Sequence, residues 1–274
     1  MELTLEELNN LKYDYKSLCV ETESFILDKI KPSLVQGVSS RTTYYWKNGE
    51  KPIQVKYLID LCKENKIINI PVKTISVNGG NKIDIPKQNN SFAYFLGILL
   101  GDGCLMISKD KGRKKSYALQ ISANKKRFAN KIQNIAKNLF GISGSIYPGE
   151  GCYNLCIYSK ALVLFLNSVY DIPIGVKYCT IKVPSKIKTK EEIIYFLKGM
   201  IDTDGNFYLH KNKTCFQLRQ KSGDFLNGIY DLFHQIDIPV NRPYYDKANN
   251  SWVIWASKTS VVDKFINETS ALKH

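Results

Sequence analysis

The fold is decided by two related stretches of nine residues, Phe95-Leu96-Gly97-Ile98-Leu99-Leu100-Gly101-Asp102-Gly103 and Leu197-Lys198-Gly199-Met200-Ile201-Asp202-Thr203-Asp204-Gly205. Each is largely apolar, places small residues four positions apart and ends in Asp-Gly. Residues four apart share one face of a helix, so each stretch predicts a helix with a smooth strip that another backbone can approach closely. The final Gly predicts a helix that ends in the left-handed region. An Asp at that end lies beside unpaired carbonyls and partial negative charge, which favours a cation nearby.

A second interpretation of either stretch alone is a strand that enters a type I′ hairpin turn. The repetition favours the helix. Asp204 follows Asp102 by 102 positions, and the segments downstream also match, residues 117–121 with 215–219 and residues 154–160 with 252–258. An internal repeat of this length predicts one supersecondary unit used twice, with a pseudo-two-fold axis between the copies.

The paired stretches resemble the LAGLIDADG signature of homing endonucleases in its two-motif, single-chain form, over roughly residues 91–274. The first copy departs from the pattern at the sixth position, where Leu100 stands in place of the acid that Asp202 supplies in the second copy. The resemblance implies an α+β fold of two pseudo-symmetric αββαββα repeats that form a saddle of antiparallel sheets. The first repeat is expected at residues 91–181 and the second at 182–274.

The N-terminal region predicts a small all-α domain at residues 1–70, followed by a Gly-, Asn- and Pro-containing linker at 71–90. Its most informative segment starts with a polar helix at Ser39, stops at Asn48-Gly49 and continues as an amphipathic helix. This pattern resembles the second half of a Cro/repressor-like helix-turn-helix. In that family the first of these helices reads DNA. The alternative is a helical domain that only packs on the rest of the chain. The resemblance makes four residues candidate DNA contacts: Ser40, Arg41, Thr43 and Tyr44.

The net charge of +14 is unevenly distributed. Residues 89–190 hold 16 Lys and Arg against 4 Asp and Glu, whereas the segments before and after are close to neutral. So large an excess of positive charge with few acids to balance it favours binding to a polyanion, here double-stranded DNA. The candidate DNA contacts in the repeats are Lys109, Lys111, Arg113, Lys114, Lys115, Lys125, Lys126, Arg127, Arg219 and Lys221.

The composition argues against a membrane or secreted protein. The sequence has no run of 18 apolar residues and no basic region at its N-terminus. Seven cysteines, an odd number, suit a reducing interior better than a disulfide framework. We therefore expect an intracellular protein, cytoplasmic or organellar, with no membrane partner.

Packing the two motif helices along their small residues would bring Asp102 and Asp204 together. Two neighbouring carboxylates resist ionising together unless a cation neutralises them. Carboxylate and carbonyl oxygens suit Mg²⁺ or Mn²⁺, so Gly101 and Thr203, the residues before each acid, join them as candidate metal ligands. A metal-activated water would then attack the scissile phosphate in line. The three His residues share no spacing that would suit a general base.

The family resemblance also implies supporting residues in each repeat. A polar strand residue, commonly Gln, follows each acid, which makes Gln120 and Gln217 candidates. A lysine late in each repeat makes Lys177 and Lys273 candidates.

The predicted function is a homing endonuclease that makes metal-dependent double-strand breaks in a long, asymmetric DNA site, as a monomer with internal pseudo-symmetry. One alternative is a catalytically silent DNA-binding regulator on the same fold, although binding alone gives no reason for an acid at each helix end. Another is a maturase, whose partner would be intron RNA. An intein is less favoured, because no splicing block flanks the repeats between Met1 and Leu272-Lys273-His274.

Overall fold

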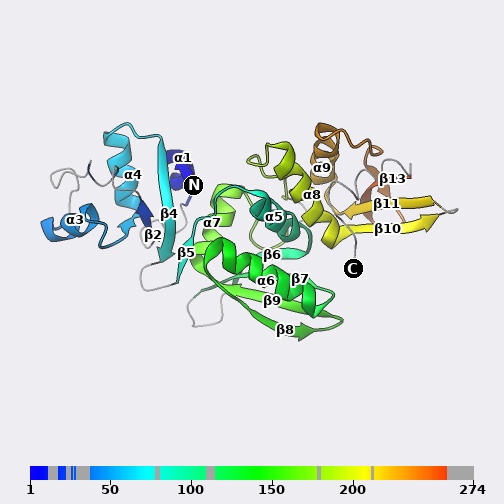
Figure 1. Ribbon diagram of the computed structural model, residues 1–274, viewed down its shortest axis with the longest axis horizontal. Helices are drawn as coiled ribbons and strands as arrows, with labels where there is room; N and C mark the ends of the chain where they lie inside the picture. The colour runs from blue at the N-terminus through cyan, green and yellow to red at the C-terminus, as the bar shows by residue number, and fades with distance from the viewer. Residues whose placement is uncertain are drawn as a thin grey trace. The chain divides into compact units, whose positions relative to one another are not determined.

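The computed structural model describes residues 1–11, 18–22, 26, 28, 38–77, 81–108, 115–177, 180–210 and 213–257 (Figure 1). The chain divides into two compact units. The first comprises Met1–Lys87, Ala136–Ile142 and Ser159–Val169, and the second comprises Gln88–Ile135, Ser143–Tyr158 and the chain from Tyr170 onward. No helix among the described residues is long and apolar enough to cross a membrane.

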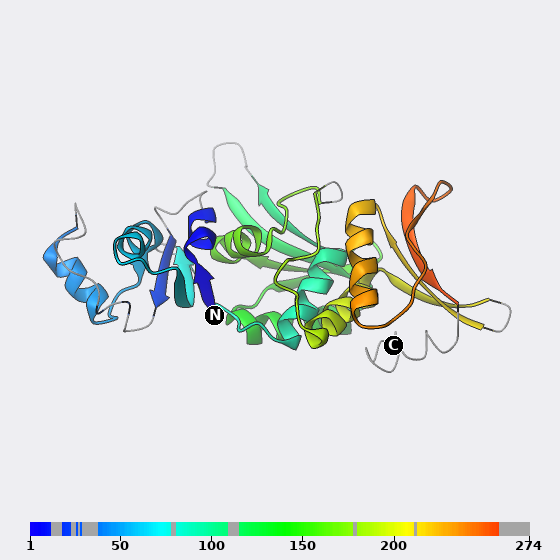
Figure 2. The same ribbon diagram turned by 90° about the horizontal axis from the view of Figure 1, so that it is seen from above.

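The two motif stretches are helices, as predicted, and the hairpin alternative is wrong for both. Helix α5 spans Asn90–Asp102 and helix α8 spans Lys190–Asp204. They lie side by side in both views (Figures 1 and 2). A capping box begins α8, since the Thr189 hydroxyl accepts from the Glu192 amide at 3.2 Å and the Glu192 carboxylate accepts from the Thr189 amide at 3.0 Å.

The small residues of the motifs allow the two backbones to touch. A Cβ built on Gly97 would overlap the Phe196 carbonyl oxygen and lie 3.0 Å from the Cα of Gly199. A Cβ built on Gly199 would overlap the Tyr94 carbonyl oxygen and lie 3.0 Å from the Cα of Gly97. The two glycines therefore face each other across the helix pair, at equivalent positions of the two copies.

The prediction that each motif helix ends in the left-handed region is wrong. Gly103 and Gly205 are extended, with φ of −98° and −76°, and each begins a strand directly. Glycine is needed there because the strand folds back tightly over the last helical turn. A Cβ on Gly103 would lie 2.6 Å from Leu99 Cδ1, and one on Gly205 would lie 2.7 Å from Ile201 Cγ2.

The second unit contains two four-stranded antiparallel sheets of the same topology, ordered β6-β7-β9-β8 and β10-β11-β13-β12. Helices α6 and α9 follow the first two strands of each copy, and α7 follows the last strand of the first copy. The expected order of helices and strands is therefore confirmed up to Ala256, and residues 258–274 of the second repeat lie outside the described residues. The elements are β6 (Gly103–Ser108), β7 (Ser116–Ala123), α6 (Lys126–Phe140), β8 (Ser145–Gly149), β9 (Cys152–Tyr158), α7 (Lys160–Tyr170), β10 (Gly205–His210), β11 (Lys213–Gln220), α9 (Gly223–Gln235), β12 (Tyr244–Asp246) and β13 (Ser251–Ala256).

The predicted all-α N-terminal domain is wrong, because the first unit is built on a five-stranded sheet of order β1-β4-β2-β3, with β5 paired to β4. The predicted linker at 71–90 is also wrong over much of its length, since it contains most of β4 and all of β5. Buried Ile70, Val72 and Ile75 fix β4 on its sheet. The elements are β1 (Glu2–Thr4), α1 (Leu5–Asn10), β2 (Leu18–Thr22), α3 (Ser40–Lys47), β3 (Ile53–Gln54), α4 (Val55–Glu64), β4 (Asn69–Val77) and β5 (Lys82–Asp84).

A single added methyl group tests the backbone contact between the motif helices. By helix propensity alone, Gly97→Ala would stabilise the protein by about 1 kcal/mol. We expect the opposite, a loss of about 2 kcal/mol in the free energy of unfolding, because the new methyl overlaps the Phe196 carbonyl. Denaturant unfolding of Gly97→Ala, with exposed Ser91→Ala as the control, shows whether the free energy of unfolding rises or falls. A stabilised Gly97→Ala variant would contradict the packing described here.

Candidate active site

The packing of α5 on α8 places the end of each helix beside the end of the other. A Cβ on Gly101 would overlap the Thr203 hydroxyl and lie 2.8 Å from the Asp204 Oδ2. The Thr203 hydroxyl donates to the carbonyls of its own helix, Met200 at 2.9 Å and Gly199 at 3.2 Å. The carboxylate of Asp204 thus lies against the last turn of the helix that carries Asp102.

A lysine side chain lies at the same place. The Lys177 ammonium donates to the carbonyl oxygens at the end of α5, at 2.8 Å to Leu100, 3.4 Å to Leu99 and 2.7 Å to Gly103, and also to the Gly101 carbonyl. Burial lowers the pKa of Lys177, while the carboxylates of Asp204 and Asp102 oppose that shift. Lys177 therefore places a positive charge at the negatively polarised end of α5, close to both acids.

A glutamine contacts one of the two acids, but it is neither of the predicted ones. Gln220 Nε2 donates to Asp204 Oδ2 at 2.7 Å. Strand register explains the difference. Gly103 pairs with Ile121 and Gly205 with Leu218, so Gln220 of the second copy corresponds to Ala123 of the first. A polar residue at the end of the strand that pairs back onto the motif Gly is the signal that could have found it.

The two predicted glutamines occupy equivalent places but make other contacts. Gln120 Nε2 donates to Asn154 Oδ1 at 3.2 Å, across to strand β9. Gln217, with its amide oxygen turned toward the guanidinium, accepts from Arg219 Nε at 3.0 Å. Neither bond is to a motif acid, so their catalytic assignment stays a prediction.

The acid unique to the second copy joins the two motif helices. Tyr94 of α5 donates its hydroxyl hydrogen to Asp202 Oδ2 of α8 at 2.5 Å, and Lys131 Nζ donates to the Tyr94 oxygen at 2.9 Å. Burial, followed by the charge of Asp202, raises the pKa of Tyr94, which keeps the phenol protonated as the donor. Asp202 thus stabilises the helix pair through this hydrogen bond. The symmetric bond cannot form, because the first copy has buried Leu100 at the equivalent position.

The predicted DNA-contacting residues of the repeats are placed in part. Lys115, Lys125, Lys126, Arg127 and Lys221 are exposed. Arg219 is half-buried and forms an ion pair with Asp246 at 2.7 Å, so part of its charge is compensated within the sheet. The remaining predicted residues lie outside the described residues: Lys109, Lys111, Arg113, Lys114 and, among the catalytic candidates, Lys273.

The predicted contacts in the N-terminal unit lie on α3. Ser40, Arg41 and Tyr44 are exposed, and Tyr44 keeps 58% of its surface in solvent. Thr43 is buried, and its hydroxyl donates to the Ser40 carbonyl at 2.8 Å. The prediction that Thr43 contacts DNA is wrong, because Thr43 faces the interior of its own unit.

The helix ends offer oxygen ligands suited to a divalent cation. The part of the chain that the structure describes contains no cluster of three or more His, Cys, Asp or Glu side chains, so a metal here would need carbonyl or water oxygens in addition to Asp102 and Asp204. The carbonyls at the end of α5 already hold one cationic group, the Lys177 ammonium. Two acids with carbonyls that accept from a cation match the hard-oxygen chemistry of Mg²⁺ and Mn²⁺.

Comparison with known families bears directly on this paired site. The model of the LAGLIDADG-like domain matches residues 89–169 and again 191–268, so that each match covers one motif helix. The chain belongs to the LAGLIDADG-like domain family. The family match begins after the N-terminal sheet and its α3 and α4, so it gives no support to the helix-turn-helix resemblance of that region.

Solved LAGLIDADG structures share the fold of about two thirds of this chain. The homing endonuclease I-DmoI, crystallised with DNA and Mn, is 21% identical, with a TM-score of 0.52 over 68% of this chain and 98% of that one. I-DmoI with DNA and Ca is 18% identical, with the same TM-score over 65% of this chain and 87% of that one. At this level of identity, the similarity establishes the α+β fold.

Curated relatives share only a segment with this LAGLIDADG chain. A component of the A-type ATP synthase of Pyrococcus abyssi is 32% identical over 162 residues, which are 58% of this chain and 15% of that protein. The probable translation initiation factor IF-2 of Methanocaldococcus jannaschii is 27% identical over 163 residues, or 57% of this chain and 13% of that protein. The chain thus spans less than a sixth of these relatives.

Removal of the Lys177 charge tests the role of its ammonium group at the end of α5. We expect Lys177→Met to lower the free energy of unfolding by about 2 kcal/mol, because buried carbonyls lose their donor and two acids lose a nearby positive charge. Thermal unfolding with exposed Lys182→Met as the control measures this loss. We also expect Ca²⁺ to raise the Tm of Lys177→Met more than that of the unmodified protein. Equal stability of the two variants would count against this role of Lys177.

Proposed function

We propose that this protein is a site-specific homing endonuclease that makes metal-dependent double-strand breaks in duplex DNA. The observation that carries the proposal is the pair of motif acids. Asp102 and Asp204 end two helices that touch through their backbones, and both acids act electrostatically on the Lys177 ammonium. Binding alone gives no reason to gather acids at a surface meant for a polyanion, whereas phosphodiester hydrolysis does.

The family similarity supports metal use and DNA as the substrate. Asp102 and Asp204, with the carbonyls of Gly101 and Thr203, would hold Mg²⁺ or Mn²⁺. When bound, the cation activates a water and stabilises the leaving oxygen of the in-line displacement. The similar structures of I-DmoI were solved with DNA and Mn or Ca, which agrees with a divalent cation and a duplex substrate.

The remaining residues would orient the acids and place the DNA. Gln220 fixes the direction of the Asp204 carboxylate by donating to one of its oxygens, as residues behind a metal ligand commonly do. Lys177 lowers the repulsion between the acids before a metal arrives. The exposed Lys115, Lys125 and Arg127 would contact phosphates at the first repeat, where the positive charge is concentrated.

The curated relatives support the view that the DNA segment encoding this domain can move between genes. Segments similar to this chain lie within proteins named for unrelated activities: ATP synthesis, translation initiation and, at 36% identity over 108 residues, a reverse gyrase. One segment shared by such different proteins is expected of a portable element. We therefore propose that cleavage serves homing of the genetic element that encodes the chain.

Sequencing of cleaved ends tests the proposed function. Randomly fragmented DNA is incubated with the protein and Mg²⁺. The DNA includes a copy of the gene's own locus from which the inserted element has been removed, so that the flanking sequences are joined. We expect recurrent ends at one long site, and loss of at least about 1,000-fold of the double-strand cleavage in Asp102→Asn or Asp204→Asn. Exposed Asp171→Asn serves as the matched control, and EDTA should abolish all cutting. Retained DNA without cut ends would favour the regulator, and preferential binding of intron RNA would favour the maturase.

The unequal surroundings of the two acids predict unequal cutting of the two strands. We expect Gln220→Ala to slow the cutting of one strand about ten-fold, because Asp204 loses its orienting bond while the first copy already has Ala123 at this place. On a supercoiled plasmid that carries the site, nicked circles should then accumulate. Gln235→Ala, at an exposed position at the end of α9, is the matched control. Equal slowing of both strands by Gln220→Ala would contradict the assignment.

A further inference from the structure

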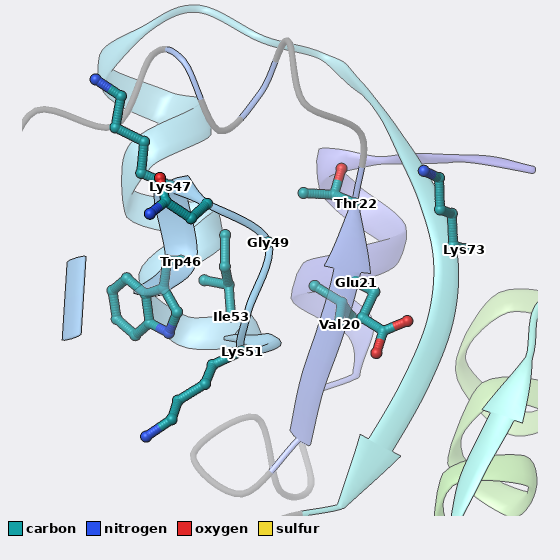
Figure 3. A pocket seen from close by; sticks show the side chains of 10 residues that line it. Val20, Glu21, Thr22, Trp46, Lys47, Gly49, Lys51, Ile53 and Lys73 are labelled. Carbon is teal, nitrogen blue, oxygen red and sulfur yellow. The ribbon is translucent and has the colours of Figure 1, made fainter. Parts of the chain in front are cut away.

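We propose that a pocket in the N-terminal unit binds a phosphate of the duplex DNA backbone, and so adds a phosphate site to the DNA contacts predicted at the repeats and on α3. The inference rests on the proposed function, since it assumes that DNA is the substrate. The pocket has a volume of about 300 Å³ and lies between β2 on one side and the end of α3 with its following turn on the other (Figure 3). It is lined by Val20, Glu21, Thr22, Trp46, Lys47, Asn48, Gly49, Lys51, Ile53 and Lys73.

The charges around this pocket favour an anion. Lys47, Lys51 and Lys73 come from three separate places, the end of α3, the turn after it and strand β4, and all three are exposed. Among the described residues of the lining the only acid is Glu21, and its carboxylate is already paired with Lys82 at 2.8 Å. Residues 1–88 hold 13 Lys and Arg against 11 Asp and Glu, so this local positive charge is not a consequence of general composition.

The interior of the pocket leaves the lysines as its exposed charged groups. Val20, Ile53 and Trp46 are at most 4% exposed, so they offer a ligand little accessible apolar surface, whereas the three lysines are exposed. A volume of about 300 Å³ lies at the lower limit of small-molecule sites. Lysines that surround an opening, without a set of converging hydrogen-bond donors, act as point charges toward phosphate and do not select a particular small molecule.

The neighbouring surface of α3 continues the positive charge away from the pocket. Arg41 Nε donates to the Tyr45 hydroxyl at 2.9 Å, and Lys51 Nζ lies 4.6 Å from the centre of the Tyr45 ring. The Tyr45 side chain thus contacts both cations, and exposed Tyr44 lies next to it, with the two rings 6.0 Å apart. Cations beside tyrosines on one surface suit contact with a nucleic-acid backbone.

The salt dependence of DNA binding tests the proposal with the full chain. The probe is a random-sequence duplex of about 40 base pairs, in Ca²⁺ so that binding is measured without cleavage. We expect the combined variant Lys47→Gln, Lys51→Gln and Lys73→Gln to lower the affinity about ten-fold and to reduce the slope of log K against log salt by about 1, since one phosphate contact is lost. The control removes three exposed lysines elsewhere in the same unit, Lys63→Gln, Lys66→Gln and Lys87→Gln, and should change the slope much less.

Three results would overturn the proposal, and they are distinguishable. Equal slopes for the pocket variant and its control would show that these lysines do not contact DNA, while cleavage by the repeats could still stand. A Tm raised by inorganic phosphate only when the pocket lysines are present, with an unchanged DNA slope, would assign the pocket to a free anion. If neither variant nor the unmodified protein binds duplex DNA, the proposed function fails together with this inference.

Discussion

The contact between two helix backbones at Gly97 and Gly199 is the constraint on which the second unit depends. Each glycine lies where a Cβ would overlap a carbonyl oxygen of the other helix, so any larger residue at either position must push the helices apart. Because the helices meet at the level of their backbones, the last turn of one lies beside the last turn of the other. The positions of Asp102 and Asp204 are therefore set by packing and not by attraction between the acids, which repel each other.

This arrangement creates an excess of negative charge that the chain itself offsets in part. Two acids lie at helix ends that already carry partial negative charge and carbonyls without intrahelical partners. Lys177 brings one positive charge to those carbonyls, although burial of its ammonium disfavours the charged form. One monovalent group against two acids leaves the site negative, which favours the binding of a divalent cation.

The sequence predicted what local patterns and the repeat determine. The two copies specified both helices, the order of strands and the acids. The family resemblance indicated Lys177, whose ammonium lies at the end of α5, while its catalytic role stays a prediction. The glutamine at Asp204 was missed because a contact between strand and helix depends on register, and Gln217 and Gln220 differ in the sequence only by three positions on β11. The N-terminal sheet was missed because Pro71 and the Gly- and Asn-rich residues after Val77 are typical of a linker. Strand β4 forms there because it pairs with β1 and β2, which are far away in the sequence.

The differences between the copies show how a fused repeat can specialise. In a symmetric pair of identical chains, a change at one motif position must be acceptable at both. Here Asp202 accepts from Tyr94 across the helix pair, whereas its counterpart Leu100 is buried, so one copy supplies the acid and the other supplies the phenol. The same freedom allows Gln220 in the second copy where the first copy has Ala123. It also allows most of the positive charge to lie in the first repeat. Under the proposed function, each half would contact a different DNA sequence, because nothing obliges the two sheets to present the same side chains.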